Sequence, residues 1–136
     1  TEFRARHRRY ARALRQRNAL LKAEWDGREW QIWTEELAVA GESLEAERRS
    51  CFELFAATMQ GRLEALLGEM GALSVSYRRG WREGCSLRER LEMLAERERQ
   101  LGHSMAGPHR ADWEVVVSGH RAREQTSRGS TTRAGR

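Results

Sequence analysis

Proline, lysine and cysteine are scarce in this chain of 136 residues, and each scarcity limits what the protein can be. Pro108 is the only proline and Lys22 the only lysine. The two cysteines, Cys51 and Cys85, have neither the spacing of metal ligands nor the pattern of a disulfide framework, so we expect free thiols in a reducing cytosol. No apolar run approaches the ~18 residues of a membrane span. We therefore expect a cytoplasmic protein without a membrane partner.

The single lysine also argues against nucleotide hydrolysis by this chain alone. A P-loop has the pattern Gly-x-x-x-x-Gly-Lys-Ser/Thr, in which the lysine reaches the β- and γ-phosphates. Leu21 precedes Lys22, so the pattern is absent. No run of four apolar residues ends in the aspartate that would hold Mg²⁺, and the histidines show no paired ligand spacing. We expect no catalytic residue, no metal site and no bound ATP or Mg²⁺ in this chain by itself.

Charge, by contrast, is abundant and unevenly distributed. Lys and Arg number 25 against 20 Asp and Glu, so the formal net charge is +5 and the isoelectric point about 10.2. A basic balance favours a polyanionic partner. Residues 1–23, however, carry eight bases and one acid (+7), whereas residues 23–70 carry four bases and eleven acids (−7). Two such segments are expected to attract each other as an antiparallel helical hairpin, which would neutralise much of the basic charge internally.

The spacing of apolar residues predicts three helices. The first covers residues 1–23, with one apolar stripe and a surface of arginines that includes Arg17. Trp25-Asp26-Gly27 interrupts the pattern, and a longer helix over roughly 29–70 follows. Ser86 and Glu89 have the Ser-x-x-Glu spacing of a capping box, which opens a third helix. The stripe of the first helix consists of Phe3, Tyr10, Leu14 and Leu21.

Two small β elements complete the expected fold. Residues 73–77 alternate with period two and predict a strand. Residues 113–117 alternate in the same way before the turn Ser118-Gly119-His120, which predicts a hairpin that ends near Glu124. From residue 126 to 136 the Ser, Thr, Gly and Arg composition predicts a disordered tail. The fold class is therefore mainly α with small β elements, α+β.

His109, Arg110 and Asp112 lie close enough in sequence to suggest a catalytic cluster. In a strand, however, residues 110 and 112 share one face while residue 109 points the other way. General acid–base catalysis needs groups that converge in a pocket. Hydrogen bonds that stabilise a turn, together with an ion pair, are the favoured interpretation.

Basic residues beside tryptophan suggest where nucleic acid would bind. Trp81 is flanked by Arg78, Arg79 and Arg82, and we take these three arginines as the first candidates for DNA contact. A tryptophan that packs under an arginine through a cation–π contact would leave the same pattern. Trp30 and Trp33 have the spacing of core residues in a helix pair. The second group of candidate DNA contacts is Arg8, Arg9, Arg12 and Arg15.

A series of short motifs runs through roughly residues 1–130. In order, the stretches are Ala13-Leu14-Arg15-Gln16-Arg17-Asn18-Ala19-Leu20-Leu21, Trp25-Asp26, Arg79-Gly80-Trp81, Arg97-Glu98-Arg99-Gln100-Leu101, Gly107-Pro108-His109-Arg110-Ala111-Asp112 and Ser127-Arg128-Gly129. In this order they resemble motifs of the bacterial RecF family of DNA repair proteins. The resemblance depends on the order, since a lone Ser-Arg-Gly would mean nothing.

The resemblance implies an ABC-type ATPase related to SMC proteins, which acts with RecO and RecR at single-strand gaps, helps to load RecA and takes part in the SOS response. The intact family uses ATP and Mg²⁺, binds single-stranded or gapped DNA and forms an ATP-dependent homodimer. Residues 1–106 would be the helical arm, or lobe II. Residues 107–130 would be a strand, which begins at Gly107–Asp112, and a hairpin that re-enter an incomplete ATPase head. There Ser127, Arg128 and Gly129 resemble the start of the signature that contacts the γ-phosphate held by the opposite subunit.

The sequence departs from the family pattern at its end. Thr126 and Ser130 stand where the family has Leu and Gln around the Ser-Arg-Gly, and residues 131–136 form a tail that does not continue the motif. We expect an interior piece of a longer protein, whether a truncated or frameshifted RecF or an excised arm. The alternative is a helical coiled-coil hairpin that serves only as a protein-interaction module. A small RNA-binding protein is a third possibility, based on the isoelectric point alone.

Overall fold

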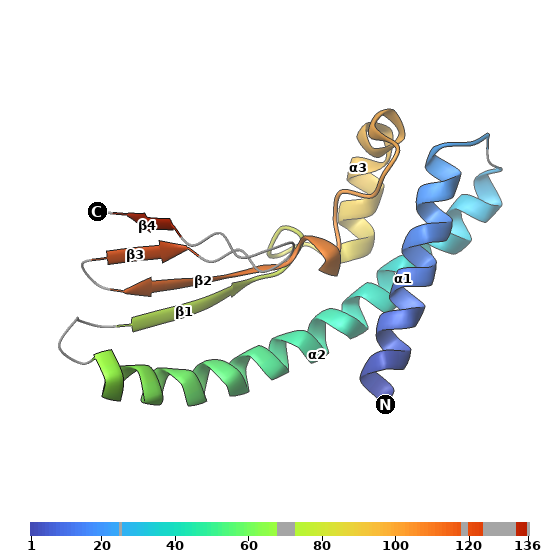
Figure 1. Cartoon of the computed structure of the whole chain (residues 1–136). Helices are drawn as coiled ribbons and strands as arrows, with labels where there is room; N and C mark the ends of the chain where they lie inside the picture. The colour runs from blue at the N-terminus through green and yellow to red at the C-terminus, as the bar shows by residue number, and fades with distance from the viewer. Residues whose placement is uncertain (25, 68–72, 118–119, 124–132, 136) are drawn as a thin grey trace. The chain divides into compact units, whose positions relative to one another are not determined.

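The structure, a computed structural model, describes residues 1–24, 26–67, 73–117, 120–123 and 133–135 (Figure 1). Their order is α1 (Glu2–Leu21), α2 (Gly27–Leu67), β1 (Leu73–Arg78), α3 (Leu87–Leu101), the 3-10 helix η1 (Pro108–Arg110), β2 (Asp112–Val117), β3 (His120–Arg123) and β4 (Arg133–Gly135). The prediction of a mainly helical chain with small β elements is confirmed. The three predicted helices occur where the sequence places them, and the strand predicted over 73–77 lies between the second and the third.

The chain forms two compact units. Unit 1 contains Thr1–Glu47 and Arg79–Arg110, and unit 2 contains Arg48–Arg78 and Ala111–Arg136. These units differ from the expected division at residue 106, since the second half of α2 and β1 group with the later strands. The assignment of residues 1–106 to an arm lobe therefore stays a prediction.

Unit 1 has a core of small, aliphatic and aromatic side chains in which α1, α2 and α3 meet. Gly41 in α2 allows this approach, because a Cβ there would meet Leu87 Cδ2, and would lie 3.3 Å from Tyr10 Cε2 and 3.4 Å from Pro108 Cδ. Leu94 and Trp33 pack against the core from the side. The core consists of Tyr10, Ala13, Leu37, Ala38, Ala40, Leu44, Trp81, Leu87, Leu91 and Ala106.

Helix α3 begins and ends through the caps that its sequence predicts. Ser86 accepts a hydrogen bond from the Glu89 backbone N–H, and the Glu89 carboxylate accepts one from Ser86 N–H, so the capping box is confirmed. Hydrogen bonds that the backbone and the side chain of Ser86 donate to the Glu89 carboxylate lower the pKa of Glu89. Glu42 of α2 accepts a further hydrogen bond from Leu87 N–H at 2.7 Å, and Gly102 ends the helix with φ of 78°.

Unit 2 combines residues 48–67 of α2 with an antiparallel sheet. Within the described residues, four strands follow the order β1-β2-β3-β4, and Arg78 pairs with Asp112 where β1 meets β2. Phe52 packs 5.3 Å from the Tyr77 ring, and the Arg49 guanidinium lies 5.4 Å from the same ring. The helix and β1 are therefore joined through Tyr77, while Ser74 and Ser76 on the alternate positions are exposed.

The structure corrects two expectations about the second half of the chain. Residues 108–110 form a turn of 3-10 helix rather than a strand, and the strand begins at Asp112. Residues 133–135 form β4, so this part of the predicted disordered tail is ordered against Arg121–Arg123. The composition of residues 133–135 does not indicate a strand, because the hydrogen bonds that order β4 come from its partner strand, β3. The predicted hairpin of β2 and β3 is confirmed, although its turn at 118–119 lies outside the described residues.

Candidate functional site

The first group of predicted DNA contacts surrounds a turn in which one arginine has a structural role. Arg79 donates from Nε to the Trp81 carbonyl at 3.3 Å and from Nη2 to the Cys85 carbonyl at 2.9 Å. Its guanidinium carbon lies 4.6 Å from the centre of the Trp81 ring. Trp81 is buried and donates from Nε1 to the Cys85 carbonyl at 3.0 Å. Arg79 and Trp81 therefore hold the turn, as in the cation–π alternative.

The other two arginines of this group present their side chains to solvent. The Arg78 side chain is 81% exposed and lies 3.9 Å from the Asp112 carboxylate, a distance at which the pair is weak. Arg82 is also exposed. Arg78 belongs to unit 2 and Arg82 to unit 1, so each is a separate candidate contact.

The second group lies along α1, and carboxylates of α2 neutralise part of its positive charge. Arg9 donates from Nε and Nη2 to the two carboxylate oxygens of Glu36, at 2.6 and 3.0 Å. This hydrogen bonding raises the pKa of Arg9 and lowers that of Glu36. Arg6 donates to Glu47 at 3.0 Å in the same helix pair. The predicted attraction between the two oppositely charged, antiparallel segments thus has direct contacts in unit 1.

The remaining arginines of α1 are less constrained. Arg12 lies 5.8 Å from the centre of the Trp33 ring, and Arg8 and Arg15 are exposed. No carboxylate of the described residues is at ion-pair distance from Arg8, Arg12 or Arg15. Their charges are therefore available to a ligand.

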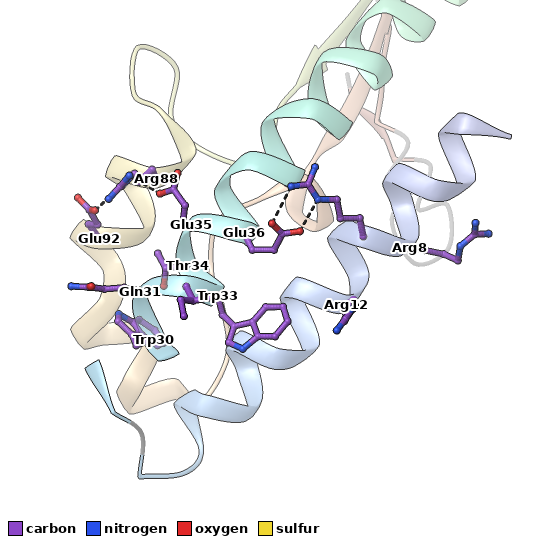
Figure 2. Close-up of a pocket in the computed structure, with 12 residues that line it drawn as sticks. Arg8, Arg12, Trp30, Gln31, Trp33, Thr34, Glu35, Glu36, Arg88 and Glu92 are labelled. Atoms are coloured by element: carbon purple, nitrogen blue, oxygen red, sulfur yellow. Dashed lines mark hydrogen bonds and ion pairs between the residues drawn. The ribbon is translucent and has the colours of Figure 1, made fainter. Parts of the chain in front are cut away.

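A groove of about 1100 Å³ lies beside these arginines in unit 1 (Figure 2). The α2 side contributes the tryptophans Trp30 and Trp33 and the half-exposed Ile32, which has 55% exposure. On the α3 side, Arg88 is paired with Glu35 and Glu92, as the dashed lines in Figure 2 show. The full lining consists of Arg8, Arg9, Arg12, Trp30, Gln31, Ile32, Trp33, Thr34, Glu35, Glu36, Arg88 and Glu92.

Beside the groove is a buried ion pair, and one of its members, Arg17, was expected on the surface. Arg17 and Glu98 are both 0% exposed, and Arg17 Nη2 lies 2.8 Å from Glu98 Oε2. Arg17 also donates to the hydroxyls of Thr34 at 3.1 Å and Ser104 at 2.6 Å. Its guanidinium carbon lies 4.3 Å from the centre of the Trp30 ring. The expected exposure of Arg17 was wrong because helical periodicity does not distinguish a paired buried arginine from a solvated one.

Burial and pairing act in opposite directions on Arg17. Loss of water around the guanidinium lowers its pKa, and the nearby Glu98 carboxylate counteracts part of that effect. Arginine nevertheless stays protonated in proteins, so the pair remains ionic at neutral pH. Glu98 Oε1 accepts a further hydrogen bond from Met105 N–H at 2.7 Å, and Asn18 accepts one from Ser104 N–H at 2.8 Å. The network fixes the segment after α3 to α1.

His109 also has a structural position in unit 1. Its Nδ1 lies 2.6 Å from the Tyr10 hydroxyl and its Nε2 lies 3.0 Å from the Ser104 carbonyl. Because a carbonyl can only accept, a neutral ring donates from Nε2 and accepts the Tyr10 proton at Nδ1. Arg110 is exposed, and Asp112 lies in unit 2 and accepts from Trp113 N–H. His109 and Asp112 of the suggested catalytic cluster thus have separate partners, and Arg110 is exposed.

The nucleotide-related predictions fall partly outside the described residues. Ser127, Arg128 and Gly129 lie outside them. Lys22 caps the end of α1, so the only lysine is not part of a phosphate-binding loop. Within the described part of the chain, no cluster of His, Cys, Asp and Glu suits a metal ion. None of the described helices is long and apolar enough to span a bilayer. Cys51 and Cys85 are free thiols, as expected.

The motif residues from distant parts of the sequence meet in unit 1. Arg17 of the first stretch pairs with Glu98 of the fourth, and Asn18 accepts a hydrogen bond from Ser104 N–H, which lies between the fourth and fifth stretches. Gly107 N–H donates to the Gly80 carbonyl at 3.2 Å, which joins the fifth stretch to Arg79-Gly80-Trp81. The resemblance therefore rests on residues that build one packed unit.

Two relatives that are similar to this chain over most of its length have the same name. No family model matches the chain. Over 123 residues it is 40% identical to the DNA replication and repair protein RecF of Xanthomonas euvesicatoria pv. vesicatoria (strain 85-10), with 90% of this chain and 33% of that protein covered. Over 127 residues it is 41% identical to the protein of the same name from Stenotrophomonas maltophilia (strain R551-3), with 90% of this chain and 34% of that protein covered.

The fold has solved counterparts as well. The structure of the recombination mediator protein RecF-ATP in the RecFOR pathway matches 88% of this chain with a TM-score of 0.77 and 22% sequence identity, over 35% of that chain. A RecF-ATPrS structure matches the same share with a TM-score of 0.76. The chain spans about a third of the length of these relatives. Over 90% of its length, this chain is a homologue of the RecF proteins.

Proposed function

We propose that this chain is a segment of a RecF-type DNA repair protein, whose parent binds ATP and single-stranded or gapped DNA. The observation that carries the proposal is the 40% identity over 90% of the chain to a DNA replication and repair protein. The fold match to a RecF-ATP structure supports the same parent. The parent would act with RecO and RecR in recombinational gap repair and the SOS response, in the cytoplasm.

Within that parent, the chain would supply the arm and the beginning of the re-entry into the head. Residues 1–106 are proposed as the helical arm, or lobe II, and residues 107–130 as the return to an ABC-type ATPase head. Ser127, Arg128 and Gly129 would contact the γ-phosphate held by a second subunit, because a hydroxyl, a guanidinium and an unhindered glycine backbone suit phosphate oxygens. ATP and Mg²⁺ are assigned to the intact protein and its ATP-dependent homodimer.

We assign DNA contact first to Arg78 and Arg82. Both side chains are exposed, and neither has a close carboxylate partner of the kind that occupies Arg9. Arg79 would support DNA binding indirectly, since its donors and its ring contact hold the turn before α3. Arg8, Arg9, Arg12 and Arg15 on α1 form the second candidate surface, and the carboxylates around Arg9 and the groove weaken its attraction for a polyanion.

Gel shifts with gapped DNA test this assignment. The Arg78→Ala/Arg82→Ala variant should bind more weakly than the wild type, and its log affinity should fall less steeply with log salt, by about 1.4 for two phosphate contacts on a single strand. Arg28→Ala/Arg97→Ala, which removes the same charge from two other exposed positions, is the matched control. Equal loss in both variants would show that net charge alone governs binding.

The second candidate function is a helical module that binds a protein partner and no nucleic acid. The groove beside α1 is the observation that favours it, since it combines apolar and charged side chains. Absence of binding to gapped DNA by the wild type, at low salt, would favour this module over direct DNA contact by the chain.

A further inference from the structure

The groove in unit 1 has a composition that suits one kind of ligand. Its α2 side includes apolar surface, with Ile32 at 55% exposure and Trp33 only partly buried. The rings and aliphatic carbons in the groove can bury an apolar side chain of a ligand. At about 1100 Å³ the groove has room for more than one such side chain.

The charges of the groove are distributed unequally between its two sides. Glu36 is engaged by Arg9, and Glu35 and Glu92 are engaged by Arg88. These pairs leave the carboxylates largely compensated. Arg8 and Arg12 lie four residues apart on the same side of α1, and no described carboxylate is within ion-pair distance of either. The α1 side of the groove therefore presents two positive charges beside an apolar surface.

This arrangement favours a peptide over a nucleic acid. Glu35, Glu36 and Glu92 are paired with arginines, so the groove presents Arg8 and Arg12 to an anion. Two charges can meet two carboxylates but cannot follow a continuous run of phosphates. The Ile32 side chain has no hydrogen-bond donor for a phosphate. The Trp30 ring already contacts the buried Arg17, whose guanidinium carbon lies 4.3 Å from the ring centre, and so is less available to stack on a base. An acidic peptide can place carboxylates at Arg8 and Arg12 and an apolar side chain against Ile32 and Trp33.

We propose that this groove docks an acidic segment of a partner protein that carries exposed aromatic or aliphatic side chains. Arg8 and Arg12 bind its carboxylates, and Ile32 and Trp33 bind its apolar side chains. The charge complementarity identifies the partner by its chemistry. The inference rests on the geometry of unit 1 and holds whether or not Arg78 and Arg82 contact DNA.

Fluorescence anisotropy with the full chain tests the proposal. The probe is a fluorescein-labelled peptide in which Asp and Glu alternate with Leu and Phe, and the control probe has Lys in place of each acid. The acidic probe should bind and the Lys probe should not. Arg8→Gln/Arg12→Gln should weaken binding about tenfold or more, as expected for two lost charge-assisted contacts. Ile32→Ser should weaken it as well.

Two controls separate docking from general attraction to a basic protein. Arg28→Gln/Arg97→Gln removes the same charge outside the groove and should keep the wild-type affinity. The indole N–H signal of Trp33, assigned in NMR spectra through Trp33→Phe, should shift when the acidic probe is added. Circular dichroism melting confirms that each variant is folded.

Three results would overturn the proposal. The first is absence of binding of the acidic probe to the wild type. The second is an equal loss of affinity in the groove variant and the Arg28/Arg97 control. The third is a single-stranded oligonucleotide that displaces the probe and loses affinity in Arg8→Gln/Arg12→Gln, which would assign the same arginines to DNA.

Discussion

At the scale of single residues, the role of an arginine in this protein depends on its environment. Arg17 is fully buried and paired with Glu98, Arg79 holds a turn, and Arg78 is 81% exposed. All three occur in stretches of similar sequence, rich in arginine. An excess of positive charge therefore does not by itself locate a nucleic-acid surface, because some of the guanidinium groups serve the interior.

The buried pair makes a prediction about stability. Glu98→Gln should destabilise unit 1 by about 3–5 kcal/mol, because the Arg17 guanidinium would remain buried without its counter-charge. Arg17→Met should cost a similar amount, since Glu98 would then be left alone. Urea unfolding followed by circular dichroism measures both. Arg15→Met on the exposed side of α1 is the control and should change stability by less than about 0.5 kcal/mol.

A double variant distinguishes two causes of that loss of stability, an uncompensated buried charge and lost hydrogen bonds. If the cost comes from one uncompensated buried charge, then Arg17→Met/Glu98→Leu should be much less destabilised than the sum of the single variants. Additive losses would instead mean that the hydrogen bonds to Thr34, Ser104 and Met105 dominate, contrary to our expectation.

At the scale of elements, α1 and α2 are joined by ion pairs as well as by apolar packing. The hydrogen bonds from Arg9 lower the pKa of Glu36 in the folded state, below its ordinary value of 4.5. A carboxyl whose folded pKa is depressed adds stability above its unfolded pKa and loses it as pH falls through the folded value. The α1–α2 pairing should therefore weaken below about pH 4.5.

Glu36→Gln tests that pH dependence. The variant should be less stable than the wild type at neutral pH, and the difference should shrink as the pH falls from about 5 to about 3. Urea unfolding at a series of pH values measures the difference. Glu24→Gln, at an exposed position between the two helices, is the control. A difference that stays constant with pH would mean that the Glu36 carboxylate does not contribute through its charge.

Two glycines in α2 should respond oppositely to the same substitution. A Cβ at Gly41 meets Leu87 and Tyr10 in the core of unit 1, whereas one at Gly61 has no atom within 4 Å. Gly41→Ala should cost about 1–3 kcal/mol from overpacking, even after the gain in helix propensity. Gly61→Ala should stabilise the helix by up to about 1 kcal/mol. Thermal unfolding of both variants checks the contrast, and stabilisation by Gly41→Ala would disprove the tight approach.

Elements were easier to predict from the sequence than the contacts between them. Apolar spacing and the Ser86–Glu89 box identified the helices, because both signals are local. The pairing of β1 with β2 joins residues 73–78 to residues 112–117, and no local pattern reports a partner so distant in the sequence. The same holds for Arg17, whose burial depends on Glu98, 81 positions along the chain (98 − 17). The predicted DNA contacts among the arginines remain predictions.

At the scale of the whole molecule, the motif stretches have a structural role first. Arg17, Asn18, Gly80, Glu98 and Gly107 connect α1, the turn before α3 and the segment after it. These five residues, far apart in sequence, therefore belong to one packed unit, unit 1.

The last prediction concerns nucleotide binding by the chain alone. Lys22 caps α1, and neither it nor the other described residues form a P-loop, so Mg-ATP should leave thermal unfolding unchanged. A ligand present at 100 times its Kd stabilises the folded state by about 2.7 kcal/mol, which for a domain of this size raises Tm by roughly 5 °C or more. Differential scanning fluorimetry with and without Mg-ATP makes the comparison, with Mg-AMP as the control. A rise with Mg-ATP alone would require a phosphate site within the chain, and Ser127→Ala and Arg128→Ala would then be the first variants to locate it.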